Sequence, residues 1–253
     1  MRLTSLLCVI LATACSRAPP TASTTTSTPI GQAATPAPWF ICDGVDAPKL
    51  LVLTRDAAGA NVAIATYDKT TGAIVSRESY ALGPSEGAAG SVYTPLRQNN
   101  ADAGAVRALN PGMLDAPGVA YTQPYSSVTL GDLRISCRWM ARTRLIGFTG
   151  RRSFVVYEDD DGDLIYTTFN FADVAAQRVV DLSKGQHTTT FSLEVRGGQE
   201  HVDAGGAAYQ FEHNGYVYDI SAPWAGAGSI RVTQNGAPVQ SEPIIGFEAG
   251  AGS

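Results

Sequence analysis

The fold class is decided by residues 153–169, which read Ser153-Phe-Val-Val-Tyr-Glu-Asp-Asp-Asp-Gly-Asp-Leu-Ile-Tyr-Thr-Thr-Phe169. Two runs of β-branched and aromatic residues flank an acidic turn that contains Asp161-Gly162. Such runs favour strands, and an Asp-Gly dipeptide readily takes the left-handed conformations that a tight hairpin turn needs. The stretch therefore predicts an antiparallel β-hairpin.

The same pattern recurs on both sides of this hairpin. Two further hairpins are predicted where apolar runs flank a Gly or an Asn-Gly turn: Leu51–Thr54, Gly59 and Val62–Tyr67; and Ser229–Thr233, Asn235-Gly236 and a last strand at Glu242–Ile245. No amphipathic helix is evident from Trp39 to Ser253. We therefore expect an all-β fold, an antiparallel sandwich or barrel. Asp68–Val75 resembles the turn between strands of a propeller blade, so a small β-propeller-like fold is a minor alternative.

An internal duplication is one interpretation of these hairpins. When Gly59 is set on Gly162, Val52 aligns with Val155 and Asp56 aligns with Asp159. The all-β domain at 39–253 would then consist of two halves, 39–140 and 141–249. The alternative is that any two β-hairpins look alike at this level.

The amino terminus has the pattern of an export signal. Arg2 is followed by an apolar run from Leu3 to Ala14 and then by Cys15. We expect residues 1–14 to be a signal peptide and Cys15 to carry a lipid, because the residues before the cysteine are small. Ordinary secretory cleavage is the alternative. A polar tether then occupies the rest of 15–38, and Ser16 after the cysteine is typical of outer-membrane lipoproteins facing the periplasm.

Cysteine usage fits an oxidising compartment. Cys8 leaves with the leader and Cys15 is taken by lipid, so the domain keeps Cys42 and Cys137. An even pair in a secreted domain predicts one disulfide. Two buried free thiols are the alternative.

The charge of the chain excludes some partners. The whole chain carries −5, and removing Arg2 with the leader makes it −6. Nucleic acid and anionic lipid select for basic surfaces, so we expect no nucleic acid partner. A basic protein partner is compatible with this charge, which is also common for solubility alone.

Few residues suggest catalysis. His187, His201 and His213 have no zinc-ligand spacing, and no nucleophile or phosphate-loop motif is present, so we expect no enzyme. Asp159, Asp161 and Asp163 have the alternating spacing of calcium loops, although a turn without metal already explains them. The chain has one dense basic stretch, whose members are expected to pair with this acidic turn: Arg138, Arg142, Arg144, Arg151 and Arg152.

One motif resembles a known family. Ala89-Gly90-Ser91-Val92-Tyr93 is similar to the S-G-x-x-Y loop of bacterial lysozyme inhibitors, both membrane-bound and periplasmic, and Gly205-Gly206-Ala207-Ala208-Tyr209 is a second version. Phe40–Gly44 also resembles the start of the membrane-bound inhibitors. The resemblance implies a protruding loop formed by Gly90, Ser91 and Tyr93, or by Gly206 and Tyr209, that enters a hydrolase cleft. The first Ser of the family pattern is replaced by Ala89 and Gly205, which leaves Ser91 as the candidate hydroxyl donor.

The resemblance implies an inhibitor or immunity lipoprotein that blocks a secreted or periplasmic peptidoglycan hydrolase. A glycosidase site holds paired carboxylates in a cleft, so a rigid loop with hydroxyl groups suits it. The competing hypothesis is a structural or adhesive envelope lipoprotein without an enzyme target. A neighbouring gene that encodes a secreted peptidoglycan hydrolase would favour the inhibitor hypothesis.

Overall fold

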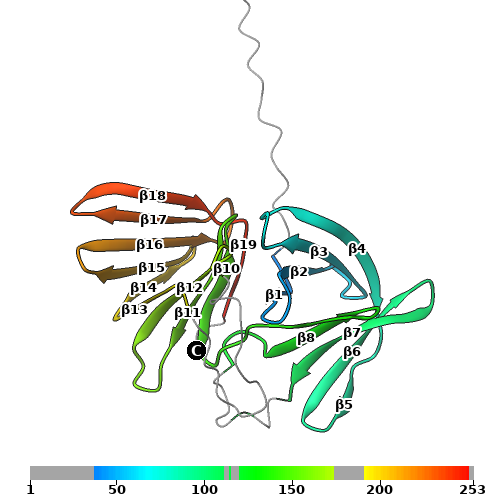
Figure 1. Ribbon diagram of the computed structural model, residues 1–253. Helices are drawn as coiled ribbons and strands as arrows, with labels where there is room; N and C mark the ends of the chain where they lie inside the picture. The colour runs from blue at the N-terminus through cyan, green and yellow to red at the C-terminus, as the bar shows by residue number, and fades with distance from the viewer. Residues whose placement is uncertain (1–36, 111–113, 115–119, 174–190, 251–253) are drawn as a thin grey trace, which may run out of the picture. The chain divides into compact units, whose positions relative to one another are not determined.

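The computed structural model describes residues 37–110, 114, 120–173 and 191–250 of the chain. These residues form antiparallel strands and no helix (Figure 1), which confirms the predicted all-β class. Within these ranges, no helix has the length and apolar composition needed to cross a membrane. The predicted signal peptide, Cys15 and nearly all of the tether lie outside the described residues.

The first half of the domain is one nine-stranded sheet. Its strands are β1 (Phe40–Asp43), β2 (Lys49–Arg55), β3 (Asn61–Asp68), β4 (Ile74–Leu82), β5 (Glu86–Ala88), β6 (Ser91–Gln98), β7 (Ala101–Leu109), β8 (Tyr125–Leu130) and β9 (Leu133–Ser136). The order is β1-β2-β3-β4-β6-β7-β8-β9, and β5 pairs with β6. Alternate residues of these strands, including Leu51, Leu53, Val62 and Ile64, form one buried cluster. This is the period-two pattern expected of strands with one covered face.

The two edge strands of this sheet are tied to each other. Gly44 and Cys137 form an isolated antiparallel bridge, and a disulfide joins Cys42 to Cys137 across 95 residues of sequence. No ladder joins β1 to β9, so the sheet is not a closed barrel. The predicted disulfide is confirmed, and the alternative of two free thiols is wrong.

The second half contains two five-stranded sheets. One has the order β13-β12-β11-β10-β19, with β10 (Thr143–Phe148), β11 (Arg152–Glu158), β12 (Leu164–Asn170), β13 (Leu193–Arg196) and β19 (Gly246–Ala249). The other has the order β14-β15-β16-β17-β18, with β14 (Gln199–Asp203), β15 (Gly206–His213), β16 (Tyr216–Pro223), β17 (Ser229–Gln234) and β18 (Ala237–Pro243).

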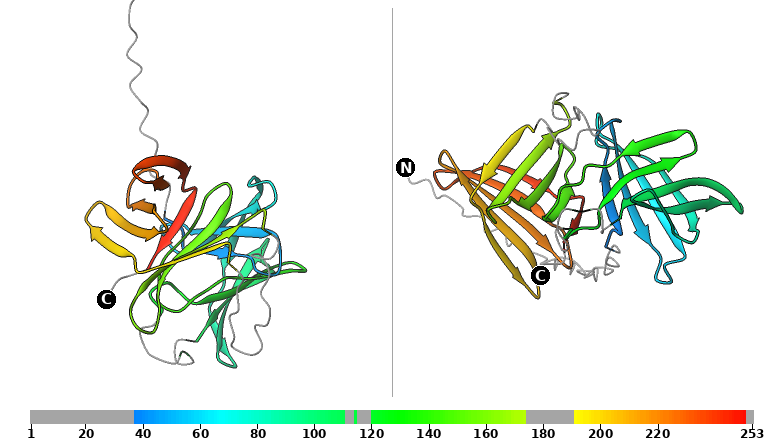
Figure 2. Two further views of the ribbon diagram at one scale, coloured as in Figure 1. Left: turned by 60° about the vertical axis from the view of Figure 1, so that its left-hand side comes forward. Right: turned by 90° about the horizontal axis from the view of Figure 1, so that it is seen from below.

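These two sheets pack face to face as a sandwich (Figure 2). Phe154, Val156 and Tyr166 from the sheet that contains β11 and β12 share one core with two residues of the β14–β18 sheet, Phe211 and Ile220. Burying an aromatic or branched side chain stabilises a fold by roughly 1.5–3 kcal/mol, so this shared core holds the sheets together.

The predicted hairpins form, with one correction at the carboxyl end. β2–β3 and β11–β12 enclose Gly59 and Gly162, whose φ angles are +68° and +86°. Asn235-Gly236 forms the turn between β17 and β18. However, Glu242–Ile245 is not the last strand, because it covers the end of β18 and the connection to β19, which joins the other sheet.

The turns at Gly59 and Gly162 are alike in detail. Asp56 accepts hydrogen bonds from its own turn through a carboxylate oxygen, and Asp159 does the same. The likeness does not extend to the surrounding sheets, one of nine strands and two of five. The propeller-like alternative is wrong, since Asp68–Val75 connects β3 to β4 within one continuous sheet.

A smaller apolar cluster lies between β1–β2 and β10. Ile41, Leu50 and Phe148 are buried there together, and the ring of Tyr67 packs edge-on against Phe148 at 4.8 Å between centroids. The outer face of the nine-stranded sheet is therefore covered at this point by β10 of the second half.

Candidate functional site at the β5–β6 hairpin

The predicted loop at Gly90 is a tight hairpin turn. Ala88 pairs with Ser91, so the connection from β5 to β6 consists of Ala89 and Gly90 alone. Both residues have positive φ angles, 44° and 77°. Two consecutive left-handed residues define the turn that matches the twist of a hairpin, and Ala occupies this conformation at a cost of about 1 kcal/mol. The exposed tip is thus short, bent and conformationally restricted.

Tyr93 is the aromatic side chain that this hairpin offers to a partner. Its side chain is 38% exposed. It lies between Glu86 of β5 and Arg107 of β7, its direct neighbours on the two flanking strands. An exposed Tyr on a paired strand loses little conformational freedom on binding, so Tyr93 suits a binding surface.

Ser91 does not have the predicted role. Its side chain is only 2% exposed, and its hydroxyl oxygen accepts a hydrogen bond of 2.9 Å from Nε of Arg107. A hydroxyl held in this way is not presented to another molecule. Ser91 therefore supports the hairpin from within and fixes the side chain of Arg107.

The second predicted loop has its aromatic residue in the wrong place for binding. Ala204 and Gly205 form the two-residue turn from β14 to β15, and Gly206 has a φ of +155°. Tyr209, however, is 3% exposed and belongs to the sandwich core. Burial raises the pKa of Tyr209, and the neighbouring Glu200 raises it further. Tyr209 is therefore a core residue, and its prediction as an inserting anchor is wrong.

The exposed aromatic residue at this second turn is Trp224, which sequence reasoning missed. Its side chain is 50% exposed, and its Nε1–H donates to the carbonyl oxygen of Asp203 at 3.0 Å. The alternation of apolar Tyr209 and Phe211 with polar residues at 210 and 212 would have placed Tyr209 inside. No sequence pattern marks Trp224, which follows Pro223 at the end of β16.

The acidic turn at Asp159 is explained by its own hydrogen bonds. Oδ1 of Asp159 accepts from the backbone N–H groups of Asp161 and Asp163 at 3.1 and 2.9 Å. The other oxygen of Asp159 pairs with Arg196 at 3.3 Å. No group of three or more His, Cys, Asp or Glu residues in the described ranges is arranged to hold a metal ion. The calcium interpretation of these three Asp residues therefore has no support in the structure.

The arginines of the basic stretch pair with two different regions of the molecule. Arg142 donates to the carbonyl oxygen of Asp159 at 2.7 Å and Arg144 forms an ion pair with Glu158, so both contact the acidic turn or its strand as expected. Arg152 instead pairs with Glu242 of β18 at 3.0 Å. Of the histidines, His201 and His213 are exposed, and His187 lies outside the described residues.

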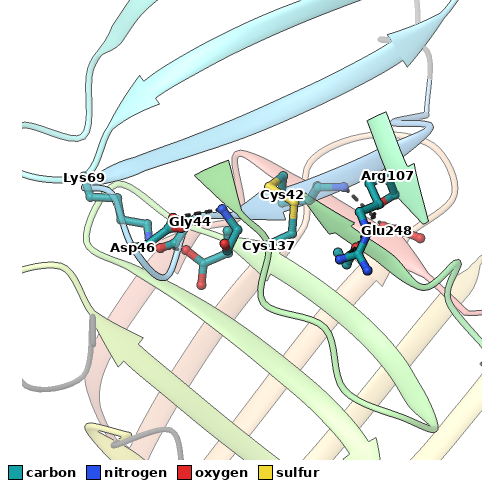
Figure 3. The surroundings of a disulfide bond; sticks show 11 residues. Cys42, Gly44, Asp46, Lys69, Arg107, Cys137 and Glu248 are labelled. Atoms are coloured by element: carbon teal, nitrogen blue, oxygen red, sulfur yellow. Dashed lines mark hydrogen bonds and ion pairs between the residues drawn. A yellow bond between two sulfur atoms is a disulfide. The ribbon is translucent and has the colours of Figure 1, made fainter. Parts of the chain in front are cut away.

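A buried charge cluster surrounds Asp43, the residue that follows the disulfide-bonded Cys42. Figure 3 labels Lys69, a member of this cluster, together with the disulfide. The Asp43 carboxylate forms ion pairs with Lys69 and with Arg138, the latter at 2.8 Å, and accepts a hydrogen bond of 2.6 Å from Ser153. The Arg138 guanidinium also lies 3.4 Å from the ring centroid of Phe169. Burial raises the pKa of Asp43, but the charges of Lys69 and Arg138 outweigh it and lower this pKa to about 2. The cluster joins β1 to β11 and has no exposed reactive group.

Glu248 is a half-buried carboxyl group that the sequence did not reveal. One carboxylate oxygen accepts a 3.2 Å hydrogen bond from the backbone N–H of Ile41. Burial raises the pKa of Glu248 to about 7, against hydrogen bonds from Ile41 and Gln123 that lower it. The adjoining cavity, lined by Trp139 and Met140 among others, has a volume of about 10 Å³. Such a space holds about one water molecule.

No protein-family model matches the chain, and no curated protein matches it either.

Proposed function

We propose that this protein binds and inhibits a secreted or periplasmic peptidoglycan hydrolase, and that the β5–β6 hairpin enters the substrate cleft of that enzyme. One observation carries the proposal. An exposed Tyr93 stands three residues after a two-residue turn with two left-handed residues. The proposal thus rests on a short, rigid projection with an aromatic residue at its side.

The proposal agrees with the chemistry of the target. A glycosidase cleft that cuts glycan chains is long, open at the surface and lined by two carboxyl groups. A turn of only Ala89 and Gly90 is narrow enough to enter such a cleft, and a preformed turn binds without an ordering cost. Tyr side chains dominate many interfaces because they bury much area with few rotatable bonds.

The surrounding properties support the same proposal. The net charge of −5 for the whole chain would speed association with a basic hydrolase. A lipid on Cys15, followed by the polar tether expected from the sequence, would hold the domain at the membrane that encloses the cell wall. Export would also supply the oxidising conditions in which Cys42 and Cys137 form their bond.

The test measures hydrolysis of purified peptidoglycan by lysozymes and by hydrolases encoded near this gene, with and without the purified protein. We expect slower hydrolysis at micromolar protein and a complex on size-exclusion chromatography. Tyr93→Ala should weaken inhibition at least tenfold, since an aromatic anchor contributes 2 kcal/mol or more. Inhibition of none of these enzymes, together with no complex, would reject the proposed function.

Trp224 provides the matched control. It is exposed beside the second turn, so Trp224→Ala removes an aromatic side chain of similar exposure from the other hairpin. We expect Trp224→Ala to keep full inhibition. If Trp224→Ala abolishes inhibition and Tyr93→Ala does not, the β14–β15 turn is the inserting loop and the assignment to β5–β6 is wrong.

The membrane anchor is tested separately. Cells that express the protein are grown with a labelled fatty acid, and the label should enter the parent chain but not a Cys15→Ser variant. Label in neither chain would reject the lipid anchor and favour simple secretion.

A further inference from the structure

We propose that Arg107, beside Tyr93, is a binding site for a carboxylate group. The proposal rests on the function above, in which the partner would be a hydrolase cleft lined by carboxyl groups. It assigns the contact with the target carboxylate to a cation on β7 and not to a hydroxyl group of the β5–β6 turn.

The guanidinium of Arg107 is held in a fixed orientation. Its Nε donates to Oγ of Ser91 at 2.9 Å and one terminal nitrogen donates to Oγ of Ser126 at 3.3 Å. The Ser126 hydroxyl donates in turn to the carbonyl oxygen of Arg107 at 3.2 Å, so its lone pairs face the guanidinium. Of the five N–H donors of an Arg side chain, these contacts occupy two. The other donors remain for an acceptor outside this group.

Arg107 forms no ion pair with any acidic residue in the described ranges of the chain. Along the sheet, Glu86 lies two strands away from Arg107, on the far side of Tyr93. Two strand spacings amount to about 10 Å, which is too far for contact. The other buried and half-buried arginines differ, since Arg138, Arg144 and Arg152 each pair with a carboxylate.

A half-buried, oriented guanidinium without an acidic partner selects a carboxylate for physical reasons. Its planar donors match the two oxygens of a carboxylate, and such charge-assisted hydrogen bonds are about twice as strong as neutral ones. Tyr93 lies directly across from Arg107 on β6, so its ring would exclude water from one side of the contact. This arrangement also accounts for Ser91, which orients Arg107 from a buried position.

The first experiment does not depend on any hydrolase. The ¹⁵N-labelled protein is titrated with sodium acetate. The Nε–Hε signal of Arg107, assigned by through-bond correlation spectra, is followed by NMR. We expect a saturable shift in the millimolar range, absent with sodium chloride at equal ionic strength. Arg97, an exposed arginine on neighbouring β6 that pairs with Asp102, is the internal control and should show no saturable shift. Equal responses of Arg97 and Arg107, or no saturable response, would overturn the proposal.

The second experiment uses a hydrolase that the parent protein inhibits. Arg107→Lys keeps the positive charge but loses the planar donors, so inhibition should weaken tenfold or more, while Arg97→Lys should inhibit like the parent. If Arg107→Lys inhibits like the parent while Tyr93→Ala does not, the carboxylate site is wrong and the proposed function survives. Thermal unfolding of both Arg variants confirms that each is folded at the assay temperature.

Discussion

At the residue scale, Asp43 shows how a buried charge can be accommodated in a small fold. Its carboxylate is fully buried and shared by Lys69, Arg138 and the Ser153 hydroxyl. Burial lowers the pKa of Lys69, and the adjacent Asp43 opposes that shift. Removing the shared carboxylate would leave two buried cations facing each other. The cluster is therefore a point where one substitution has a large effect.

We expect Asp43→Asn to lower the free energy of unfolding by about 3–5 kcal/mol, the usual cost of breaking a buried ion pair on one side. Urea denaturation measures this loss. Asp102→Asn is the control, because Asp102 pairs with Arg97 at the surface and should cost less than about 1 kcal/mol. Similar losses of unfolding free energy for both variants would mean that the buried ion pairs stabilise the fold no more than the exposed pair does.

Glu248 makes stability depend on pH in the neutral range. The pKa of Glu248 is about 7 in the folded protein, above its ordinary value of 4.5, so folding favours the protonated form. The resulting stabilisation is complete below pH 4.5 and is lost as the pH rises through 7, by at most about 3 kcal/mol. Glu248→Gln should flatten this decline between pH 5 and 8. Parallel stability curves for parent and variant would contradict the assignment.

Asp43 acts in the opposite direction at lower pH. Its pKa of about 2 lies below the ordinary 3.8, so its stabilisation is complete above pH 3.8 and is lost as the pH falls toward 2. Neither group could be singled out from the sequence. Asp43 stands between Cys42 and Gly44 in a short strand, and only the pairing of distant strands brings Arg138 and Ser153 to it.

At the element scale, the backbone of the β5–β6 turn is strained at Ala89, which lies in the hairpin that we propose enters the hydrolase cleft. Ala89 has a φ of +44°, which Asn adopts more readily than Ala. Ala89→Asn should therefore raise the free energy of unfolding by up to about 1 kcal/mol. Chemical denaturation compares this variant with Ala58→Asn in the turn of the β2–β3 hairpin, where no positive φ occurs at that residue. A gain in both, or in neither, would argue against strain at Ala89.

The strands and turns were predictable because they depend on local chemistry. The sequence placed hairpin turns at Gly59, Gly162 and Asn235-Gly236, and all three occur. Strand pairing was less predictable, because register and sheet membership depend on contacts between distant residues. For this reason the prediction of a last strand at Glu242–Ile245 is wrong, since the last strand begins at Gly246 and joins the other sheet. The burial of Ser91 was hidden for the same reason, since its partner Arg107 is on a different strand.

At the scale of the whole molecule, the disulfide is the one covalent link between distant parts of the described chain. It closes a loop of 95 residues, for which the chain-entropy model gives about 4.7 kcal/mol. Cys42→Ser with Cys137→Ser should lower the free energy of unfolding by about 2–5 kcal/mol, measured by urea denaturation. The parent protein under reducing conditions should lose a similar amount of unfolding free energy. If the urea midpoint is unchanged in the double variant and in the reduced parent, the prediction is refuted.

The position of the disulfide also decides how the domain would respond to a pull on its amino-terminal side. Force applied before Trp39 reaches β1, an edge strand with a ladder to β2 on one side only. Peeling would proceed from Phe40 and stop at Cys42, where the bond to Cys137 passes the tension to the opposite edge of the sheet. Beyond that point the strands would have to shear together and not unzip one by one. The disulfide would therefore oppose the peeling of a domain that is tethered at this end.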